Sequence, residues 1–169
     1  MTGIYYKKFA ESYPLLKTSI IDAIGKSAQS CNNTATEYHY TDYNIDLNIP
    51  RLYEPFVMPA IMDHMRAFER HYDFKGIELV SMWFQSYPQS GFHDWHVHPS
   101  CHFTNIFYIK LPDKMASTQI KNPYDHNRPI IIDIDEGDIL TIPGFFPHCS
   151  PILQQDSEKI IISFNTNII

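Results

Sequence analysis

The sequence predicts a mainly β protein, a sandwich or barrel of jelly-roll type with N-terminal helices packed on the sheet. In the second half of the chain, Ile, Val, Tyr and Phe recur in short alternating runs separated by Gly, Pro, Asp and Asn, which is typical of strands and hairpin turns. The first part instead has two patterns of helical period. Helices followed by a β-rich body favour this architecture. With 169 residues, of which 44% are of hydrophobic type, we expect a single domain over 1–169.

The first 75 residues form the expected helical part. In "PLLKTSIIDAIGKSAQS" (14–30), Leu16, Ile20, Ile21 and Ile24 recur at helical spacing, and Pro14 suits a first turn. A second helix is expected from about Glu54 to His71, with Pro55 or Pro59 in its first turn. One face of it should pack on the sheet and carries Val57, Ala60, Ile61, His64, Met65 and Phe68.

Residues 76–169 form the expected β-rich core. The predicted strands are "GIELVSMWFQSYP", "FTNIFYIKL", "STQIKN", "PIIIDI", "DILTIPG" and "EKIIISFNTNII". In the first of them a regular strand would place six side chains on one face: Ile77, Leu79, Ser81, Trp83, Gln85 and Tyr87.

Composition excludes several classes of partner and compartment. The net charge is -6 and the basic residues are scattered, so no nucleic-acid partner is expected. No run approaches the ~18 apolar residues of a membrane span, and the N-terminus lacks the apolar core of a signal peptide. Three cysteines without CxxC spacing indicate neither a disulfide framework nor a zinc knuckle. A cytoplasmic protein without a membrane partner is expected.

The most informative stretch is "HDWHVHPSCH" (93–102), with four histidines in ten residues. In an extended segment, Asp94, His96 and His98 would project from one face while His93 and Trp95 point elsewhere. A His-x-His pair on a strand can supply two imidazoles to one metal ion, and imidazole suits Fe(II), Zn(II), Cu(II) or Ni(II). The pattern therefore indicates a metal site in the β-rich core.

The best candidate for a third ligand is His148 in "DILTIPGFFPHCSPI", because a strand and a Pro-Gly turn place it near a sheet end. The hairpins of a jelly roll can bring that strand beside the first pair. Ordinary surface or packing roles are expected for His39, His64, His71 and His126, and His64 reads as a hydrogen-bonded core residue. His93 and His102 remain unassigned, and Cys101 and Cys149 are expected to be small packing residues.

Three stretches together resemble a family of 2-oxoglutarate-Fe(II) oxygenases, here in an HxH…H variant. "WHVHPSCHFTNIFYI", "GDILTIPGFFPHCSPI" and "KIIISFN" are similar to the family's order of W-x-H-x-H-P, a Ser-Gly-aromatic-Tyr strand, G-D-L-x-x-F-P-x-x-x-x-H and Arg-x-x-x-S-F-N. The resemblance covers about residues 80 to 167, half of the chain. It implies a double-stranded β-helix, which is a cupin-like jelly roll.

The resemblance implies that His96, His98 and His148 hold Fe(II), with His98 in the place of the usual carboxylate. It also implies 2-oxoglutarate as cosubstrate. Lys159 stands where the family has the arginine that pairs with the distal carboxylate of 2-oxoglutarate, and Lys110 is the rival anchor. Tyr108 is retained as a hydrogen-bond donor, while Thr104 and Asn105 replace the Ser-Gly pair.

The implied activity is an Fe(II)- and 2-oxoglutarate-dependent oxygenase that hydroxylates a peptide or small-molecule substrate. Trp83, Gln85, Trp95 and Phe146 are candidates to line its pocket. Two alternatives stay open: a three-histidine, cupin-like dioxygenase that uses no keto acid, and a non-catalytic metal-binding β-domain.

Overall fold

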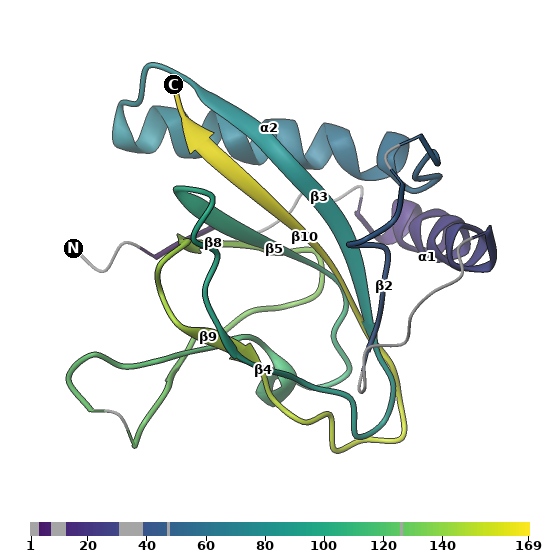
Figure 1. Ribbon diagram of the computed structural model, residues 1–169. Helices are drawn as coiled ribbons and strands as arrows, with labels where there is room; N and C mark the ends of the chain where they lie inside the picture. The colour runs from purple at the N-terminus through teal and green to yellow at the C-terminus, as the bar shows by residue number, and fades with distance from the viewer. Residues whose placement is uncertain (1–3, 8–12, 31–38, 47, 126) are drawn as a thin grey trace.

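Figure 1 shows the computed structural model, which describes residues 4–7, 13–30, 39–46, 48–125 and 127–169. Two α-helices come early in the chain, α1 (Tyr13–Ser30) and α2 (Glu54–Tyr72). The strands are β1 (Tyr5–Lys7), β2 (Tyr40–Thr41), β3 (Ile77–Tyr87), β4 (His93–His96), β5 (Phe103–Lys110), β6 (Gln119–Ile120), β7 (Ile130–Ile131), β8 (Ile139–Pro143), β9 (His148–Ser150) and β10 (Lys159–Ile168), and a 3-10 turn, Lys114–Ala116, precedes β6.

The strands form two antiparallel sheets, as expected for a mainly β fold. The order in the larger sheet is β1-β8-β5-β10-β3-β2, and in the smaller sheet it is β4-β9-β6-β7. The eight strands β3 to β10 thus supply four neighbouring strands to each sheet, which is a jelly-roll arrangement. The first 75 residues are not purely helical, because β1 and β2 are the two edges of the larger sheet.

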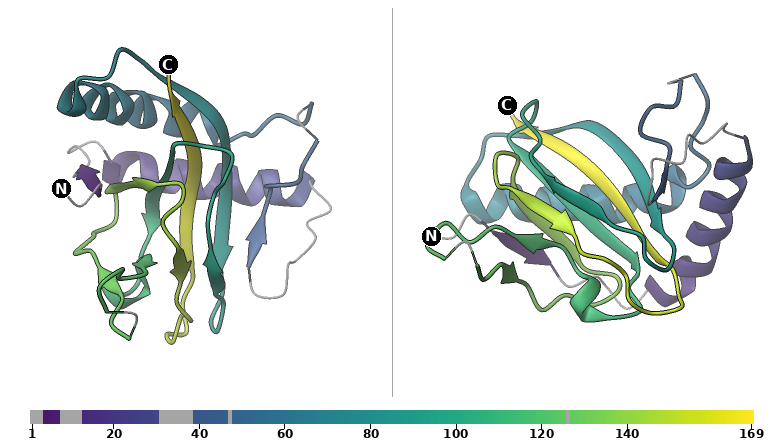
Figure 2. Two further views of the ribbon diagram at one scale, coloured as in Figure 1. Left: turned by 60° about the vertical axis from the view of Figure 1, so that its left-hand side comes forward. Right: turned by 60° about the horizontal axis from the view of Figure 1, so that its bottom comes forward.

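The two faces of the larger sheet bury different clusters of side chains. On β10, Ile160, Ile162 and Phe164 belong to a cluster that also contains residues of α1 and α2. Ile161 points the opposite way, into a cluster with Ile120 of β6, because side chains alternate along a strand. Figure 2 shows both helices on one side of the larger sheet and the smaller sheet on the other. The site described below lies between the sheets.

Helix α2 buries the face that the sequence predicts. Its buried residues are Val57, Ala60, Ile61, His64, Met65 and Phe68. His64 is a hydrogen-bonded core residue as expected, with Nε2 2.7 Å from Thr141 Oγ1. Pro55 lies in the first turn and Pro59 lies inside the helix. The helix ends at Tyr72 and is followed by Asp73, whose backbone is left-handed.

Strand β3 differs from the expectation of one regular face. The pairing of β10 with β3 passes from Asn165↔Ser81 to Thr166↔Leu79, so Val80 is an extra residue in β3. A bulge of this kind turns the following side chains to the other face. Ile77 and Leu79 therefore pack on the helix side, while Trp83, Gln85 and Tyr87 face the smaller sheet and line the site.

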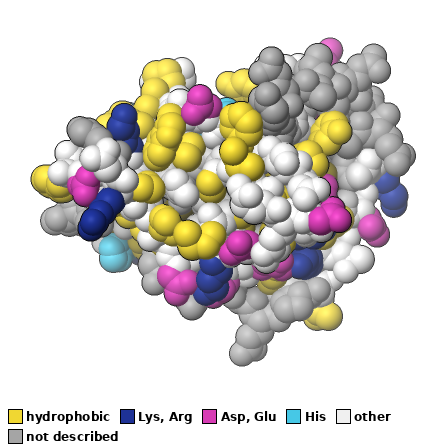
Figure 3. Space-filling view, turned by 90° about the horizontal axis from the view of Figure 1, so that it is seen from below, with side chains coloured by type: hydrophobic (Ala, Val, Ile, Leu, Met, Phe, Trp, Pro, Cys, Tyr) yellow, Lys and Arg dark blue, Asp and Glu magenta, His cyan; other side chains and the backbone are white. Residues whose placement is uncertain are grey.

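Two surface properties complete the description. On the face seen in Figure 3, the basic side chains lie apart from one another, and acidic side chains are near them. Lys114, for example, lies 2.7 Å from an oxygen of Asp133 and 2.8 Å from one of Asp135. Neither described helix combines the length and the apolar character that a membrane crossing requires.

Candidate metal centre and adjoining cavities

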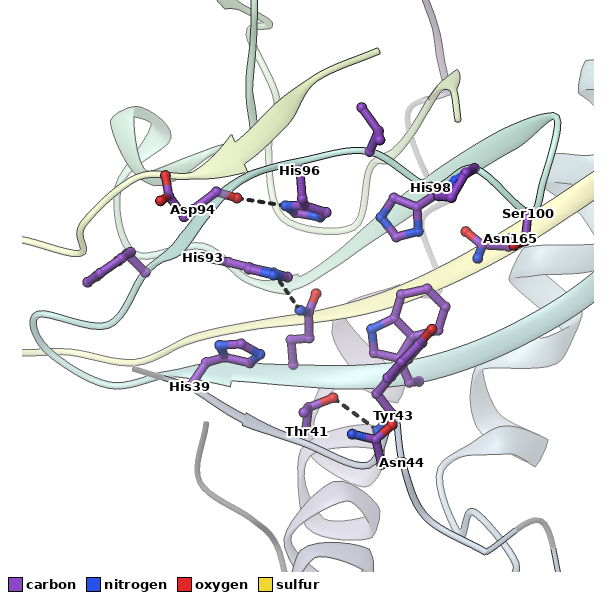
Figure 4. Close-up of a pocket in the computed structure, with 15 residues that line it drawn as sticks. His39, Thr41, Tyr43, Asn44, His93, Asp94, His96, His98, Ser100 and Asn165 are labelled. Carbon is purple, nitrogen blue, oxygen red and sulfur yellow. Dashed lines mark hydrogen bonds between the residues drawn. The ribbon is translucent and has the colours of Figure 1, made fainter. Parts of the chain in front are cut away.

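Three histidines from separate segments converge between the two sheets. His96 ends β4, His98 follows it in a loop, and His148 begins β9. His96 and His148 are paired across the antiparallel β4–β9 ladder, which brings the distant His148 beside the His-x-His pair. One ring nitrogen from each of the three lies within 4.8 Å of the other two, close enough for all three to bind one ion. Figure 4 shows the His96 and His98 side of this cluster.

Backbone carbonyls fix the orientation of two of these rings. His96 Nδ1 lies 2.7 Å from the Asp94 carbonyl oxygen, and His148 Nδ1 lies 2.8 Å from the Phe146 carbonyl oxygen. A carbonyl only accepts, so each Nδ1 carries the proton and donates it. The Nε2 lone pairs of both rings are then available to a metal.

His98 is held by its backbone and by stacking. Its amide donates to the Gly144 carbonyl at 2.7 Å, and its ring stacks on Trp83 with centroids 5.8 Å apart. Gly144 is needed here because a Cβ at that position would lie 2.6 Å from the Cys101 carbonyl oxygen and 2.7 Å from that of His98. The close approach ties the His98 loop to the turn before β9.

The electrostatic environment keeps the three rings neutral. Burial, followed by the neighbouring His96, lowers the pKa of His98 to about 4. Burial is also the first cause that lowers the pKa of His148 to about 3, and it lowers that of His96. A neutral imidazole is the form that binds metal ions. The cluster is therefore in its metal-binding protonation state at neutral pH.

His93 was expected to point away from the metal ligands, and this expectation is wrong. Its ring stacks on that of His96, with centroids 3.9 Å apart and planes at 16°, and it stacks on His39 at 4.9 Å. The cause is a register shift in the β4–β9 pairing between His93 and His96, which interrupts the alternation of side chains. Asp94 is exposed beside this stack.

An open cavity of about 790 Å³ adjoins the cluster. Two imidazoles of the cluster, His96 and His98, lie in its wall, and Figure 4 shows how the lining side chains point into it. Among the described residues that line it, Asp94 is the one carboxylate and there is no Lys or Arg. The whole lining is His39, Thr41, Tyr43, Asn44, Trp83, Gln85, Phe92, His93, Asp94, His96, Val97, His98, Pro99, Ser100 and Asn165.

A second, inner cavity of about 30 Å³ lies deeper between the sheets. All three clustered histidines line it, together with Tyr87 and Ser150. Lys159 lines neither cavity itself but lies behind these two wall residues: its Nζ donates to Ser150 Oγ at 2.7 Å and lies 4.9 Å from the centre of the Tyr87 ring.

Lys159 is a buried amine without an anionic partner among the described residues. Only 1% of it is exposed, and besides Ser150 its Nζ donates to the Ala116 carbonyl at 2.6 Å. No described carboxylate lies within ion-pair distance of it. Burial lowers the pKa of Lys159 to about 7. Buried charges are normally paired, so this site lacks a negative partner.

The other predicted cosubstrate residues have different surroundings. Lys110 lines neither cavity and lies 3.5 Å from Glu158 with a third of its side chain exposed. Tyr108 is buried and also lines neither cavity; its hydroxyl donates to Thr118 Oγ1 at 2.8 Å. Thr104 is buried and does line the inner cavity.

Of the four side chains predicted to line the substrate pocket, two do so and two do not. Trp83 and Gln85 line both cavities as expected, whereas Trp95 and Phe146 line neither. His102 is exposed, and its Nδ1 accepts the Ile168 amide. The position of Asn165 on the expected last strand, six residues after Lys159, was the one sequence signal that could have placed its side chain in the site.

Comparison with solved structures shows the fold. The chain is similar to a 2OG-Fe(II) oxygenase family oxidoreductase from Burkholderia pseudomallei, with 9% identity, a TM-score of 0.71, and 98% of this chain and 84% of that chain covered. It is also similar to HygX from Streptomyces hygroscopicus, solved with nickel and 2-oxoglutarate bound, with 10% identity, a TM-score of 0.65 and coverages of 99% and 83%.

A third similar structure is a prolyl hydroxylase from Trichoplax adhaerens in complex with a peptide fragment of hypoxia inducible factor. The identity is 12%, the TM-score 0.67, and the coverage 98% of this chain and 84% of that chain. No protein-family model and no curated protein sequence matches the chain. The likeness is therefore one of fold, carried over almost the whole chain, with little identity of sequence.

Proposed function

We propose that this protein is an Fe(II)- and 2-oxoglutarate-dependent oxygenase that hydroxylates its substrate. The observation that carries the proposal is the pairing of two features along one inner cavity. Three neutral imidazoles converge on one point in its wall. The buried amine of Lys159, which has no anionic partner among the described residues, lies behind two other wall residues, Ser150 and Tyr87. The first feature suits a metal ion and the second suits a carboxylate.

The donor set fits ferrous iron. Three imidazoles on one side of an ion leave its other positions open, as a bidentate keto acid and O2 require. His96, His98 and His148 would hold the ion, and backbone carbonyls already orient the Nε2 atoms of His96 and His148 for this. When bound, iron and 2-oxoglutarate supply an oxidation in which the keto acid loses CO2 to give succinate and one atom of O2 enters a substrate C–H bond.

Lys159 is the residue that supports a keto acid rather than a three-histidine chemistry without one. A distal carboxylate bonded to Lys159 Nζ would compensate the buried charge. Ser150 orients the ammonium group. Tyr108 orients Thr118, which lines the inner cavity, and Thr104 is a further wall residue. Lys110 already has Glu158 as a partner, so we assign the anchor to Lys159.

Binding of 2-oxoglutarate must widen the inner cavity. Its volume of about 30 Å³ holds about one water molecule, not a five-carbon keto acid. Gln85 is the side chain best placed to move, because among the described residues that line both cavities it is the one that carries no ring. It is held by Ser163 Oγ, which donates to Gln85 Oε1 at 3.0 Å, and lies 3.2 Å from His93.

The outer cavity is the proposed substrate site. Its volume of about 790 Å³ suits a small molecule or one side chain of a peptide with its neighbours. No lysine or arginine is among the described residues of its wall, which offers the Asp94 carboxylate and several neutral acceptors. We therefore propose an uncharged or cationic substrate.

The test is an anaerobic titration of the Fe(II)-loaded protein with 2-oxoglutarate, monitored by the weak visible charge-transfer band of an iron–keto acid complex. We expect the band in the wild type and in Lys110→Met. It should be lost in His148→Ala, which lacks a metal ligand, and in Lys159→Met, which lacks the anchor.

Each other outcome has a defined meaning. If iron binds but saturating 2-oxoglutarate gives no band, the keto-acid reading is wrong, and the three-histidine dioxygenase takes its place when O2 is consumed in a substrate screen. Iron binding without the band and without O2 consumption leaves a non-catalytic metal-binding domain. If iron itself does not bind, the metal site is wrong.

A further inference from the structure

One of the three clustered rings lacks the hydrogen bond that the other two have. His96 and His148 each donate Nδ1–H to a backbone carbonyl. For His98, neither ring nitrogen has a hydrogen-bond partner among the described residues; its ring is held only by stacking on Trp83 and His148. Metal-binding histidines almost always donate their second N–H to an acceptor, which fixes the tautomer and the ring direction.

One acceptor in the same region lacks a donor. The Oδ1 atom of Asn165 is buried and has no hydrogen-bond partner among the described residues, and only 9% of this residue is exposed. A buried amide oxygen without a partner is costly and uncommon in folded proteins. Asn165 lines the outer cavity, as His98 does, and Figure 4 shows its amide pointing into the space that the His98 ring also enters.

We propose that Asn165 Oδ1 accepts the Nδ1–H of His98 when the metal is bound, and thereby positions the third ligand. This inference rests on the metal-binding part of the proposed function. A small rotation of the His98 ring that places Nε2 on the ion turns Nδ1 away from it. The His98 N–H, which lacks an acceptor, and the Asn165 Oδ1, which lacks a donor, then form one hydrogen bond with each other.

The imidazole of His98 explains why an acceptor such as Asn165 Oδ1 is needed beside it. A carboxylate at position 98 could only accept hydrogen bonds, so its neighbour would have to be a donor. An imidazole bound through Nε2 instead presents a donor, and needs an acceptor to stay in that tautomer. The side-chain amide oxygen of Asn165, on β10 of the larger sheet, supplies it. Asn165 therefore matches a histidine at position 98 and is a positioning residue.

The experiment compares Zn(II) binding by the full-length wild type, Asn165→Leu and Asn165→Asp. Leucine removes the acceptor at similar size, and we expect Zn(II) affinity to fall ~10- to 100-fold. Aspartate keeps an acceptor, so its affinity should stay within about threefold of the wild type or exceed it. Because the amide oxygen has no partner in the metal-free protein, the Tm of metal-free Asn165→Leu should not fall.

A spectroscopic signature separates positioning from general damage. In the Zn(II)-loaded wild type, proton NMR should show slowly exchanging imidazole N–H resonances from all three ligands, and Asn165→Leu should lose the one assigned to His98. The matched control is Asn167→Leu, two residues along the same strand, where the amide oxygen accepts the His102 N–H. It should lower Tm and leave Zn(II) affinity unchanged.

The outcomes distinguish this inference from the proposed function. If the wild type binds Zn(II) but Asn165→Leu binds it equally well and keeps the His98 resonance, the positioning role is wrong while the metal site stands. If Asn165→Leu lowers the Tm of the metal-free protein as Asn167→Leu does, Asn165 is a structural residue. Failure of the wild type to bind any metal overturns the proposed function itself.

Discussion

Among single residues, Lys159 is held in surroundings that normally exclude an ammonium group. Its neutral partners satisfy hydrogen bonds but not charge, and burial lowers its pKa to about 7. Lys159→Met should therefore weaken 2-oxoglutarate binding at pH 7 by ~100-fold or more, since a charge-assisted bond is removed from a buried site. Isothermal titration of the metal-loaded protein measures this. The control Lys110→Met, which affects an exposed ion pair, should change affinity less than threefold.

The same residue predicts how stability depends on pH. In the unfolded chain Lys159 has an ordinary lysine pKa, near 10.4, but in the folded chain its pKa is about 7. Between these values the unfolded state binds more protons, so folding becomes more favourable as pH rises. Below pH 7 both states are protonated, and the buried charge destabilises the folded state by its full amount. The difference in unfolding free energy between wild type and Lys159→Met should rise by about 1.4 kcal/mol per pH unit from pH 7.5 to 9.5. Urea unfolding at three pH values measures it; a flat difference would show that Lys159 titrates normally.

Sequence patterns could predict the histidine cluster because it depends on local spacing and on the connectivity of the fold. The i, i+2 relation of His96 and His98 survives in the structure, and the proposed return of His148 follows from jelly-roll connectivity. The stacking of His93 on His96 could not be predicted, because it depends on a register shift. Alternation along the last strand could place Asn165 on the site face, but not show that its amide oxygen lacks a partner. Neither a shift of pairing nor a missing partner leaves a signal in the order of residues.

At the scale of elements, the turn between β8 and β9 holds the His98 loop through Gly144. The His98 amide donates to the Gly144 carbonyl, and the Gly144 amide donates to that of His102. In Gly144→Ala the new methyl group would meet two backbone carbonyls at 2.6 and 2.7 Å, so the loop must move. We expect metal affinity to fall at least tenfold, as for a displaced ligand.

The measurement is Zn(II) affinity beside the Tm of the metal-free protein. Gly25→Ala is the matched control, because nothing lies within 4 Å of a Cβ at that helical position. Alanine is the better helix former there, so this variant should keep wild-type affinity and gain slightly in Tm. Equal affinity of Gly144→Ala and the wild type would show that the loop does not depend on the close approach.

Alternation of apolar residues predicts neither the face change within β3 nor the lengths of the short strands β6 and β7. The long β3 and β10 were expected from their apolar runs, but the face of β3 changes at the Val80 bulge, which no run of residue types announces. The stretches 117–122 and 129–134 pair over only two residues each, Gln119–Ile120 and Ile130–Ile131. Pairing there is limited by the neighbouring strands, so tertiary structure decides how much of each apolar run becomes a strand.

In the whole molecule, the two faces of the larger sheet have different roles: one packs against the helices and the other carries the site. One face packs with the helices in an apolar cluster, and the other carries the two cavities and their polar groups. On β10 this division follows from alternation: Ile160, Ile162 and Phe164 face the helices, while Lys159, Ile161 and Ser163 face the site. A strand rigidly packed on one side is a good support for a site on the other, because its side chains have few alternative directions.

The charge of the outer cavity predicts which substrates the whole protein accepts. Asp94 is its one lining carboxylate and no lysine or arginine faces it among the described residues, so an anionic group entering it would find no cation to offset its desolvation. In a panel of capped peptides and small molecules matched in size, those that stimulate succinate formation should be uncharged or cationic. Asp94→Lys leaves the metal ligands and Lys159 in place, and should shift the preference toward anionic members by about tenfold in kcat/KM. Succinate release measured in both proteins decides this: stimulation of the wild type by anionic members above all others would contradict the assignment of this cavity to an uncharged or cationic substrate.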